Sequence, residues 1–122
     1  MNLKGKTALV TGGARGIGFA AVKRLLIDGA RCVIRDRDQK AIDDAKAQLT
    51  DLGEVTSDRV ELANPDSVEA LAGQVLKRHG KIDILVNNAG IAGVNKMLWE
   101  CTPEEWREVM DVDLYGVFLC CR

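Results

Sequence analysis

Four glycines lie in the octet TGGARGIG, at Gly12, Gly13, Gly16 and Gly18, between an apolar run over residues 7–10 and a helical pattern. Glycine lets a backbone turn tightly and lets a ligand approach it. A helix N-terminus offers free N–H groups and a positive dipole end, which favour phosphate. Gly12 would allow the turn, Gly16 the approach of a pyrophosphate, and Gly18 close packing of helix on strand. The octet therefore predicts a dinucleotide site, and the alternative is a glycine turn that only packs.

An acidic residue follows the glycines at the spacing that this chemistry requires. Asp36 ends a second apolar run, and a carboxylate about 20 positions after the glycines can accept hydrogen bonds from an adenosine ribose. Its charge would repel the 2′-phosphate of NADP, which favours NAD, whereas Arg15, Arg35 and Arg37 argue for NADP. Strand alternation points Arg35 and Arg37 away from Asp36. We expect Arg35 in particular to lie on a solvated surface; in the packing alternative Asp36 is a solvated loop acid.

Strand and helix patterns alternate along the chain. Apolar runs predict strands over 7–10, 31–36 and 82–86, with a weaker, more polar strand over 55–62 at a sheet edge. Helices are predicted over 17–28, over 39–52, from Asn64-Pro65 to Gly80, from the capping box at Thr102, and from Asp113 onward. This alternation indicates parallel strands with helical crossovers. We predict an α/β fold, a Rossmann-like doubly wound parallel sheet that is incomplete at the C-terminal side, with residues 1–122 forming part of one domain.

Composition excludes several classes of function. The chain has 17 basic and 18 acidic residues, scattered rather than clustered, and a net charge of -1, so we expect neither nucleic acid nor a membrane surface as a partner. No apolar run reaches membrane-spanning length, and no signal-peptide pattern opens the sequence. The four cysteines lack Cys-x-x-Cys spacing, which disfavours zinc and disulfides. We expect a cytoplasmic protein with reduced thiols and no metal site.

A second motif, Asn87-Asn88-Ala89-Gly90, breaks the strand predicted over 82–86, and Asp83 stands near the start of that strand. With the glycine octet at these separations, the whole chain resembles the N-terminal half of a classical short-chain dehydrogenase/reductase. The resemblance implies hydride transfer between NAD or NADP and an alcohol/ketone pair, with a small-molecule substrate. It also implies a homo-oligomer whose interface includes the last helix.

The resemblance places the cofactor against the glycine loop and against the segments that follow two later strands. It puts Asn87 beside the adenosine ribose. It puts Glu61-Leu62 against the adenine, where the family has Asp followed by an apolar residue. The predicted cofactor-binding residues are Gly12, Gly13, Ala14, Arg15, Gly16, Ile17, Gly18, Asp36, Glu61, Leu62, Asn87, Ala89 and Gly90.

The sequence departs from the family at its catalytic groups, which are Asn, Ser, Tyr and Lys, the last two spaced four apart. Asp113 stands at the Asn position and offers the same main-chain carbonyl with a charged side chain. No serine follows Ser67, and Tyr115 is followed four residues later by Leu119. Losing the general acid removes a factor of about 10²–10⁴ in rate. We expect the complete protein to be an NAD(P)-dependent enzyme and this chain alone to be inactive.

Two other functions stay open: a non-catalytic nucleotide-binding module or pseudoenzyme, and an assembly partner that associates through an unfinished sheet edge. The strand over 82–86 should lack a neighbour on one side, and the last helix is apolar nearly all round, so we expect an oligomer or an aggregate. His79 fits the last turn of a helix rather than a catalytic base. Trp99 and Trp106 are expected to pack a loop and a helix.

Overall fold

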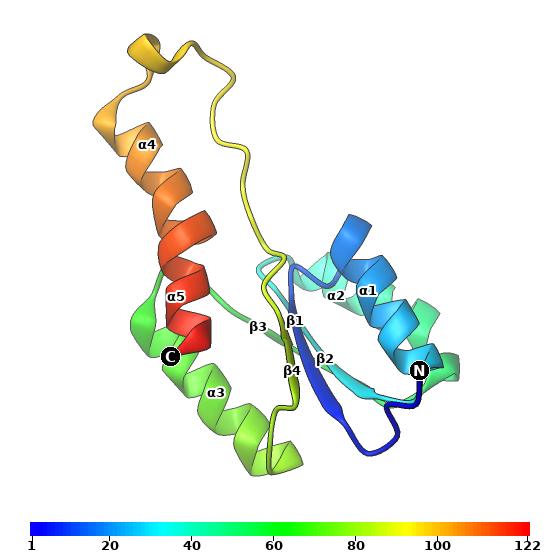
Figure 1. Ribbon diagram of the computed structural model, residues 1–122. Coiled ribbons are helices and arrows are strands. Elements are labelled where there is room, and N and C mark those ends of the chain that lie inside the picture. The colour runs from blue at the N-terminus through cyan, green and yellow to red at the C-terminus, as the bar shows by residue number, and fades with distance from the viewer.

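A computed structural model describes all 122 residues. Four parallel strands form one sheet in the order β3-β2-β1-β4, with helices on both of its faces (Figure 1). The strands are β1 (Thr7–Thr11), β2 (Arg31–Asp36), β3 (Val55–Arg59) and β4 (Ile84–Val86). The helices are α1 (Gly16–Ile27), α2 (Gln39–Leu49), α3 (Pro65–His79), α4 (Pro103–Met110) and α5 (Gly116–Cys121). The predicted α/β doubly wound class is confirmed.

The helices begin where the sequence supplies caps. Asp38 Oδ1 accepts the Ala41 N–H at 3.1 Å to open α2, and Asn64 Oδ1 accepts the Ser67 N–H at 3.2 Å to open α3. A side-chain oxygen in this place satisfies a backbone donor that has no partner within the helix. The predicted capping box also forms at the start of α4. These caps fix which residues enter each helix and therefore where the preceding loops lie.

Two apolar clusters hold the layers together. On one face, β1 and β2 pack against α1 and α2 through side chains such as Val22, Ile34 and Ile42. On the other face, Val33 and Leu9 pack against α3 and α5. Because successive strand residues point to opposite faces, β1 and β2 are apolar on both sides, and every residue of β1 is buried. This doubly covered pair of strands is the rigid part of the sheet.

Several boundaries differ from the predicted ones. The edge strand β3 ends at Arg59 rather than at residue 62, because β2 ends at Asp36, the register partner of Arg59, and a turn follows in which the Asn64 N–H bonds to the Glu61 carbonyl. The second helix ends in a 3₁₀ turn over Thr50–Leu52. Strand β4 is shortened to three residues.

The C-terminal helices also differ from the prediction of a new helix at Asp113. A π-helical turn over Asp111–Tyr115 joins α4 to α5 in one helical run (Figure 1). No Pro or Gly breaks the chain between Trp106 and Asp113, so the helix continues and absorbs one extra residue as a bulge. Trp106 is 56% exposed and Trp99 is 81% exposed, so the expected packing of both tryptophans is wrong.

Strand β4 has a neighbour only in β1, so its other edge is open. After β4, a long loop carries the chain away from the sheet before it returns through α4 (Figure 1). None of the helices has the length and apolar character needed to cross a bilayer.

Candidate functional site

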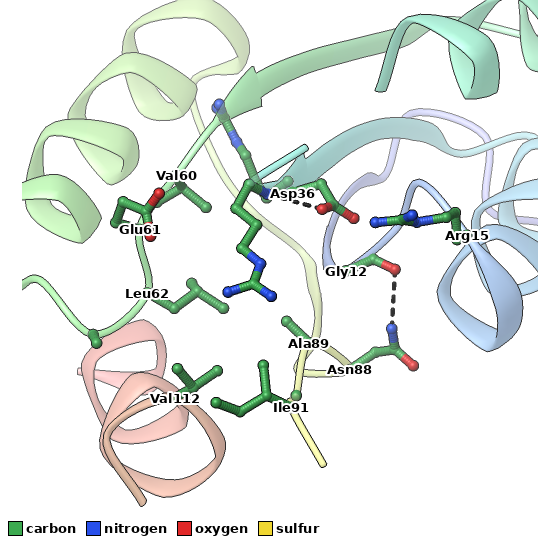
Figure 2. Close-up of a pocket in the computed structure, with 14 residues that line it drawn as sticks. Gly12, Arg15, Asp36, Val60, Glu61, Leu62, Asn88, Ala89, Ile91 and Val112 are labelled. Carbon is green, nitrogen blue, oxygen red and sulfur yellow. Dashed lines mark hydrogen bonds between the residues drawn. The ribbon is translucent and has the colours of Figure 1, made fainter. Parts of the chain in front are cut away.

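A cavity of about 270 Å³ opens at the carboxyl ends of the strands. In open α/β sheets this is the edge where ligands bind. The glycine turn and the end of β2 form one side, the segment after β3 forms a wall, and the segment after β4 forms the floor (Figure 2). The lining residues are Gly12, Arg15, Arg35, Asp36, Arg37, Val60, Glu61, Leu62, Ala63, Asn88, Ala89, Gly90, Ile91 and Val112.

The glycine loop packs too closely for side chains at two of its positions. Gly12 has φ +62°, and a Cβ there would lie 2.9 Å from the Ala89 Cα. A Cβ on Gly18 would overlap the carbonyl oxygen of Gly12. The Gly12 N–H donates to the Arg35 carbonyl at 2.7 Å, which seats the turn on the end of β2. Gly12 and Gly18 therefore serve close packing of turn, helix and strand.

Gly16 differs from these two glycines because open space surrounds it. Its φ is +54°, and a Cβ there would meet nothing within 4 Å. It begins α1, whose first turn has no side-chain cap, and the first N–H groups of a helix have no partner within the helix. Ile17 beside it is 83% exposed. A bare helix N-terminus with open space in front suits an anion.

Thr11 and Asn88 tie the glycine turn to the end of β4. Thr11 Oγ1 accepts the Asn88 N–H at 3.0 Å and the Ala89 N–H at 3.1 Å. In return, Asn88 Nδ2 donates to the Thr11 and Gly12 carbonyls, both at 3.1 Å, and Figure 2 shows the bond to Gly12. Loops after two different strands thus hold each other in place, and the floor of the cavity is fixed relative to the glycine turn.

Asp36 is held rigidly at the end of β2. Its Oδ1 accepts the Arg37 N–H at 2.8 Å and the Asp38 N–H at 3.2 Å. Both bonds fall on one oxygen, and no ion pair engages Asp36. The second carboxylate oxygen is therefore available to a ligand in the cavity. Figure 2 shows the Arg15 side chain extending toward this carboxylate.

The three arginines near Asp36 have different surroundings. Arg15 pairs with Asp38 across 3.2 Å, and both side chains are largely exposed. Arg37 is exposed and lines the cavity. Arg35 is fully buried and pairs with Asp58, so the expectation of a solvated Arg35 is wrong. Its side chain points to the face that α3 covers, as strand alternation requires.

Apolar side chains form the far side of the cavity. Figure 2 shows Leu62, Ile91 and Val112 gathered around its lower part. Glu61 is exposed, and its Oε1 lies 3.6 Å from Arg59 Nη2. An apolar slot next to Asp36 has the character of a site for a flat ring, which gains from contact on its faces.

Asp113 contacts the segment that follows β4. Its Oδ1 accepts the Ile91 N–H at 2.8 Å, and a Cβ on Gly90 would lie 3.2 Å from the same oxygen. Asp113 lies in the π-helical turn, which turns its side chain toward this loop. An amide oxygen at this position could accept the same bond, so the change from the family Asn keeps the acceptor.

The structure brings about half of the predicted cofactor residues to the cavity wall. These are Gly12, Arg15, Asp36, Glu61, Leu62, Ala89 and Gly90. Gly13, Ala14, Gly16, Ile17 and Gly18 lie in the adjoining loop and first helical turn. Asn87 lies outside the lining, and its Nδ2 donates to Cys121 Sγ at 3.3 Å. A ribose contact of Asn87 stays a prediction.

Sequence reasoning left out other residues that line the cavity, chiefly Asn88, Val60 and Ile91. The signal for Asn88 was present, because a polar residue directly after a buried strand must find backbone partners, and Thr11 ended the neighbouring strand. Ile91 and Val112 carried no such signal. They meet only because the π-helical turn returns to the loop after β4.

The remaining titratable groups lie away from this cavity. Burial lowers the pKa of His79, whose ring contacts Thr56 at 3.3 Å, and α3 ends at this residue as expected. Burial raises the pKa of the Cys32 thiol to about 12. No cluster of three or more His, Cys, Asp or Glu side chains is placed to hold a metal ion. None of these groups adds chemistry to the cavity.

Comparisons with known proteins agree with this geometry. A family model described as short chain dehydrogenase matches residues 6–122. The chain is 38% identical over 123 residues to a 3alpha-hydroxysteroid dehydrogenase of Mediterraneibacter gnavus, covering 98% of this chain and 49% of that protein. The chain thus spans about half the length of this curated relative.

Solved structures are similar over the same span. One is a metagenomic short-chain oxidoreductase in complex with NADP, with TM-score 0.94, 36% identity, and coverage of 98% of this chain and 55% of that one. Another is a 3-ketoacyl-(acyl-carrier-protein) reductase of Brucella melitensis complexed with NADH, with TM-score 0.91, 34% identity, and coverage of 99% and 49%.

Proposed function

The chain belongs to the short-chain dehydrogenase family, and from that premise we propose that it forms the nucleotide-binding half of an oxidoreductase. The reaction is hydride transfer between a nicotinamide cofactor and an alcohol/ketone pair on a small molecule. The observation that carries the proposal is the glycine turn, which lies beside Asp36 on one side of a cavity at the carboxyl ends of the strands. Relatives bound to NADP and to NADH support the class of cofactor.

The residues present fit a dinucleotide. The open helix start at Gly16 would take the diphosphate, because uncapped N–H groups and the helix dipole attract it. Asp36 would take the ribose hydroxyls through its free oxygen. The apolar wall at Val60 and Leu62 would take the adenine face. The bound cofactor would supply the hydride acceptor or donor, and the residues of this chain would bind and orient the cofactor.

NAD is the cofactor that we propose for this site. A 2′-phosphate would stand against the Asp36 carboxylate, which its two backbone bonds prevent from turning away. Arg15, which could neutralise that phosphate, is already paired with Asp38 at 3.2 Å. Arg37 is exposed beside the cavity and is the residue that could favour NADP.

Asp113 serves this function by holding the loop that forms the cavity floor, through its bond to the Ile91 N–H. Its main-chain carbonyl is the group that we assign to the proton relay of the complete protein. The 122 residues contain no Tyr-x-x-x-Lys. Turnover is therefore proposed for a protein that adds a serine and that motif to this half.

The test is calorimetric titration of the chain with NAD, NADP and AMP. We expect NAD and AMP to bind and NADP to bind more weakly than NAD. In the Asp36→Asn variant, the amide keeps the backbone acceptor but loses the charge. We expect NAD to bind about tenfold more weakly, because hydrogen bonds to a charged group contribute about 1.5–3 kcal/mol, and the preference for NAD over NADP to shrink.

The matched control is Asp43→Asn, which removes one acidic charge from the outer face of α2, where Asp43 accepts a bond from Gln39 at 2.9 Å. We expect its affinities to equal those of the parent chain. Binding of none of the three nucleotides would contradict the proposed function. Tighter binding of NADP than of NAD would contradict only the role given to Asp36.

A further inference from the structure

A fully buried charge lies directly behind the nucleotide cavity. Arg35 in β2 is 0% exposed, and its Nη1 lies 2.5 Å from Asp58 Oδ2. The two residues are register partners across β2 and β3, so they form a cross-strand pair on the face covered by α3. Arg78 in α3 approaches the same Asp58 oxygen at 3.7 Å. One carboxylate thus serves two guanidinium groups.

Arg35 is the buried member of this pair, and the Asp58 side chain is 29% exposed. Val33 and Val60 belong to the apolar cluster on the same face. The Arg35 guanidinium has an ion pair with Asp58, and its nitrogens form no hydrogen bond with any other group. Burial, with a smaller contribution from Arg78, lowers the pKa of Arg35 to about 10, so it stays charged at neutral pH. A buried charged pair adds little stability compared with an apolar pair. Stability therefore does not explain the pair, and its role is sought in the position it gives to neighbouring residues.

The position of the pair along β2 and β3 indicates such a role. Strand β3 is an edge of the sheet, so β2 is its only strand neighbour. Just beyond the pair, the N–H of Val60, two residues after Asp58, donates to the carbonyl of Asp36 at 3.1 Å. Val60 and Leu62 then form the wall of the cavity. Arg35 and Asp58 are therefore the last side-chain link across the two strands on this face before β3 leaves the sheet.

We propose that Arg35 and Asp58 are a positioning pair that fixes the adenine wall relative to Asp36. The inference rests on the proposed function for its ligand. The positioning of Val60 and Leu62 by the pair is a property of the chain without ligand. Loss of the link should let Val60 and Leu62 move away from Asp36. The cavity would then widen, and the adenine would lose contact with the wall while the ribose carboxylate stays in place.

The test is a cycle of three variants: Asp58→Asn, Arg35→Met, and the double variant Arg35→Met/Asp58→Val. Two readouts are taken, AMP affinity by calorimetry and hydrogen exchange of the Val60 amide relative to the amides of β1. Coupled neighbours commonly interact strongly enough to change an equilibrium about tenfold. We expect Asp58→Asn to weaken AMP about tenfold and to speed Val60 exchange while β1 stays protected. Arg35→Met should act in the same direction less strongly, since Asp58 keeps Arg78.

The double variant distinguishes positioning from a contribution of each side chain. An apolar cross-strand pair can replace a buried ion pair without loss of order, so we expect AMP affinity within about twofold of the parent. Asp44→Asn is the control, because it breaks the exposed Lys40–Asp44 pair of 2.8 Å on α2, and it should change neither readout.

The outcomes separate the two proposals. Parent-like AMP affinity and Val60 exchange in both single variants would overturn the positioning role, as would a double variant that loses as much as the two single losses together. If the single variants do not fold, the double variant decides: native AMP affinity supports the pair, and weakened affinity overturns it. If the parent chain does not bind AMP, the proposed function fails, and the exchange data alone decide the positioning role.

Discussion

The two sides of the sheet differ in how they are completed. On the side of β1 and β2, every residue of β1 is buried and the helices α1 and α2 cover one face. On the side of β4, no strand residue is fully buried, and α4 has no buried residue at all. Large apolar side chains there are open to solvent, including Leu98, Trp99, Trp106, Leu114 and Phe118. The side of β1 and β2 is thus finished, and the side of β4 presents apolar surface suited to burial.

Strand β4 nevertheless keeps a defined place, because side chains hold it at both ends. At one end, Asp83 Oδ2 accepts the Thr7 N–H at 2.9 Å. At the other, Thr11 Oγ1 accepts two backbone N–H groups from the segment after β4. These polar links hold β4 in place although β1 is its only strand neighbour. The site therefore depends on β1 for its order and on these links for its floor.

The largest effect is expected on the finished side, from Gly18→Ala. The added Cβ would overlap the Gly12 carbonyl oxygen, so the turn or α1 must shift. Overpacking against backbone costs about 3 kcal/mol of unfolding free energy. We expect a large drop in the urea midpoint and loss of AMP binding. Thermal and urea unfolding with calorimetry measure both.

Gly73→Ala is the matched control for Gly18→Ala. Gly73 lies in α3, where a Cβ would meet nothing within 4 Å. Replacing a helical glycine with Ala stabilises by about 0.5–1 kcal/mol, and AMP affinity should not change. If the two substitutions had similar effects, the close packing of the glycine turn would not be the feature that orders the site.

A smaller effect, with a pH dependence, is expected at the far end of β4 from Asp83→Asn. A hydrogen bond from Lys81, then the Thr7 N–H, lowers the pKa of Asp83 to about 2. A carboxyl group with a lowered folded-state pKa stabilises above its unfolded pKa of about 4 and loses that contribution as pH falls toward 2. We expect the variant to unfold more easily than the parent at pH 7, with the difference shrinking from pH 4 downward.

Urea unfolding of the two proteins between pH 7 and pH 3 measures this difference. Lys4→Gln is the control for a change of surface charge at the same end of the sheet, since no ion pair involves Lys4. A gap between parent and Asp83→Asn that stays constant across the pH range would mean that the amide, not the lost charge, causes the change.

The sequence predicted the finished side well because its signals are local. Apolar runs, caps and glycines each depend on neighbours within a few residues, and the fold class and the glycine turn follow from them. Asp36 at the end of β2 was found because a strand end fixes its place. The burial of Arg35 was not predicted, although strand alternation gave the direction of its side chain. Only the register between β2 and β3 shows that Asp58 lies opposite Arg35.

The other side was predicted less well because its contacts join distant segments. The hydrogen bond from the Ile91 N–H to Asp113 joins residues 22 positions apart, so no local sequence pattern predicts it. Because of the π-helical turn, the helix also continues through Asp113, where a new helix was predicted to begin. Trp99 and Trp106 were expected to pack a loop and a helix, but both side chains are exposed.

The smallest effect on folding, and the sharpest test of the comparison, is expected from Phe118→Glu. Phe118 is 56% exposed in α5 and stacks on Tyr115 with ring centroids 5.9 Å apart, so its loss should change the unfolding free energy by no more than about 0.5 kcal/mol. We expect the parent chain to self-associate through this exposed apolar surface. Burying such a side chain contributes about 1.5–3 kcal/mol, so Phe118→Glu should weaken association about tenfold or more. Size-exclusion chromatography with light scattering over a range of concentrations measures this, and Gln74→Glu on α3, with the same change of charge, should associate like the parent. A parent chain that stays monomeric at high concentration and melts cooperatively would show that the open side is stable against water without a partner.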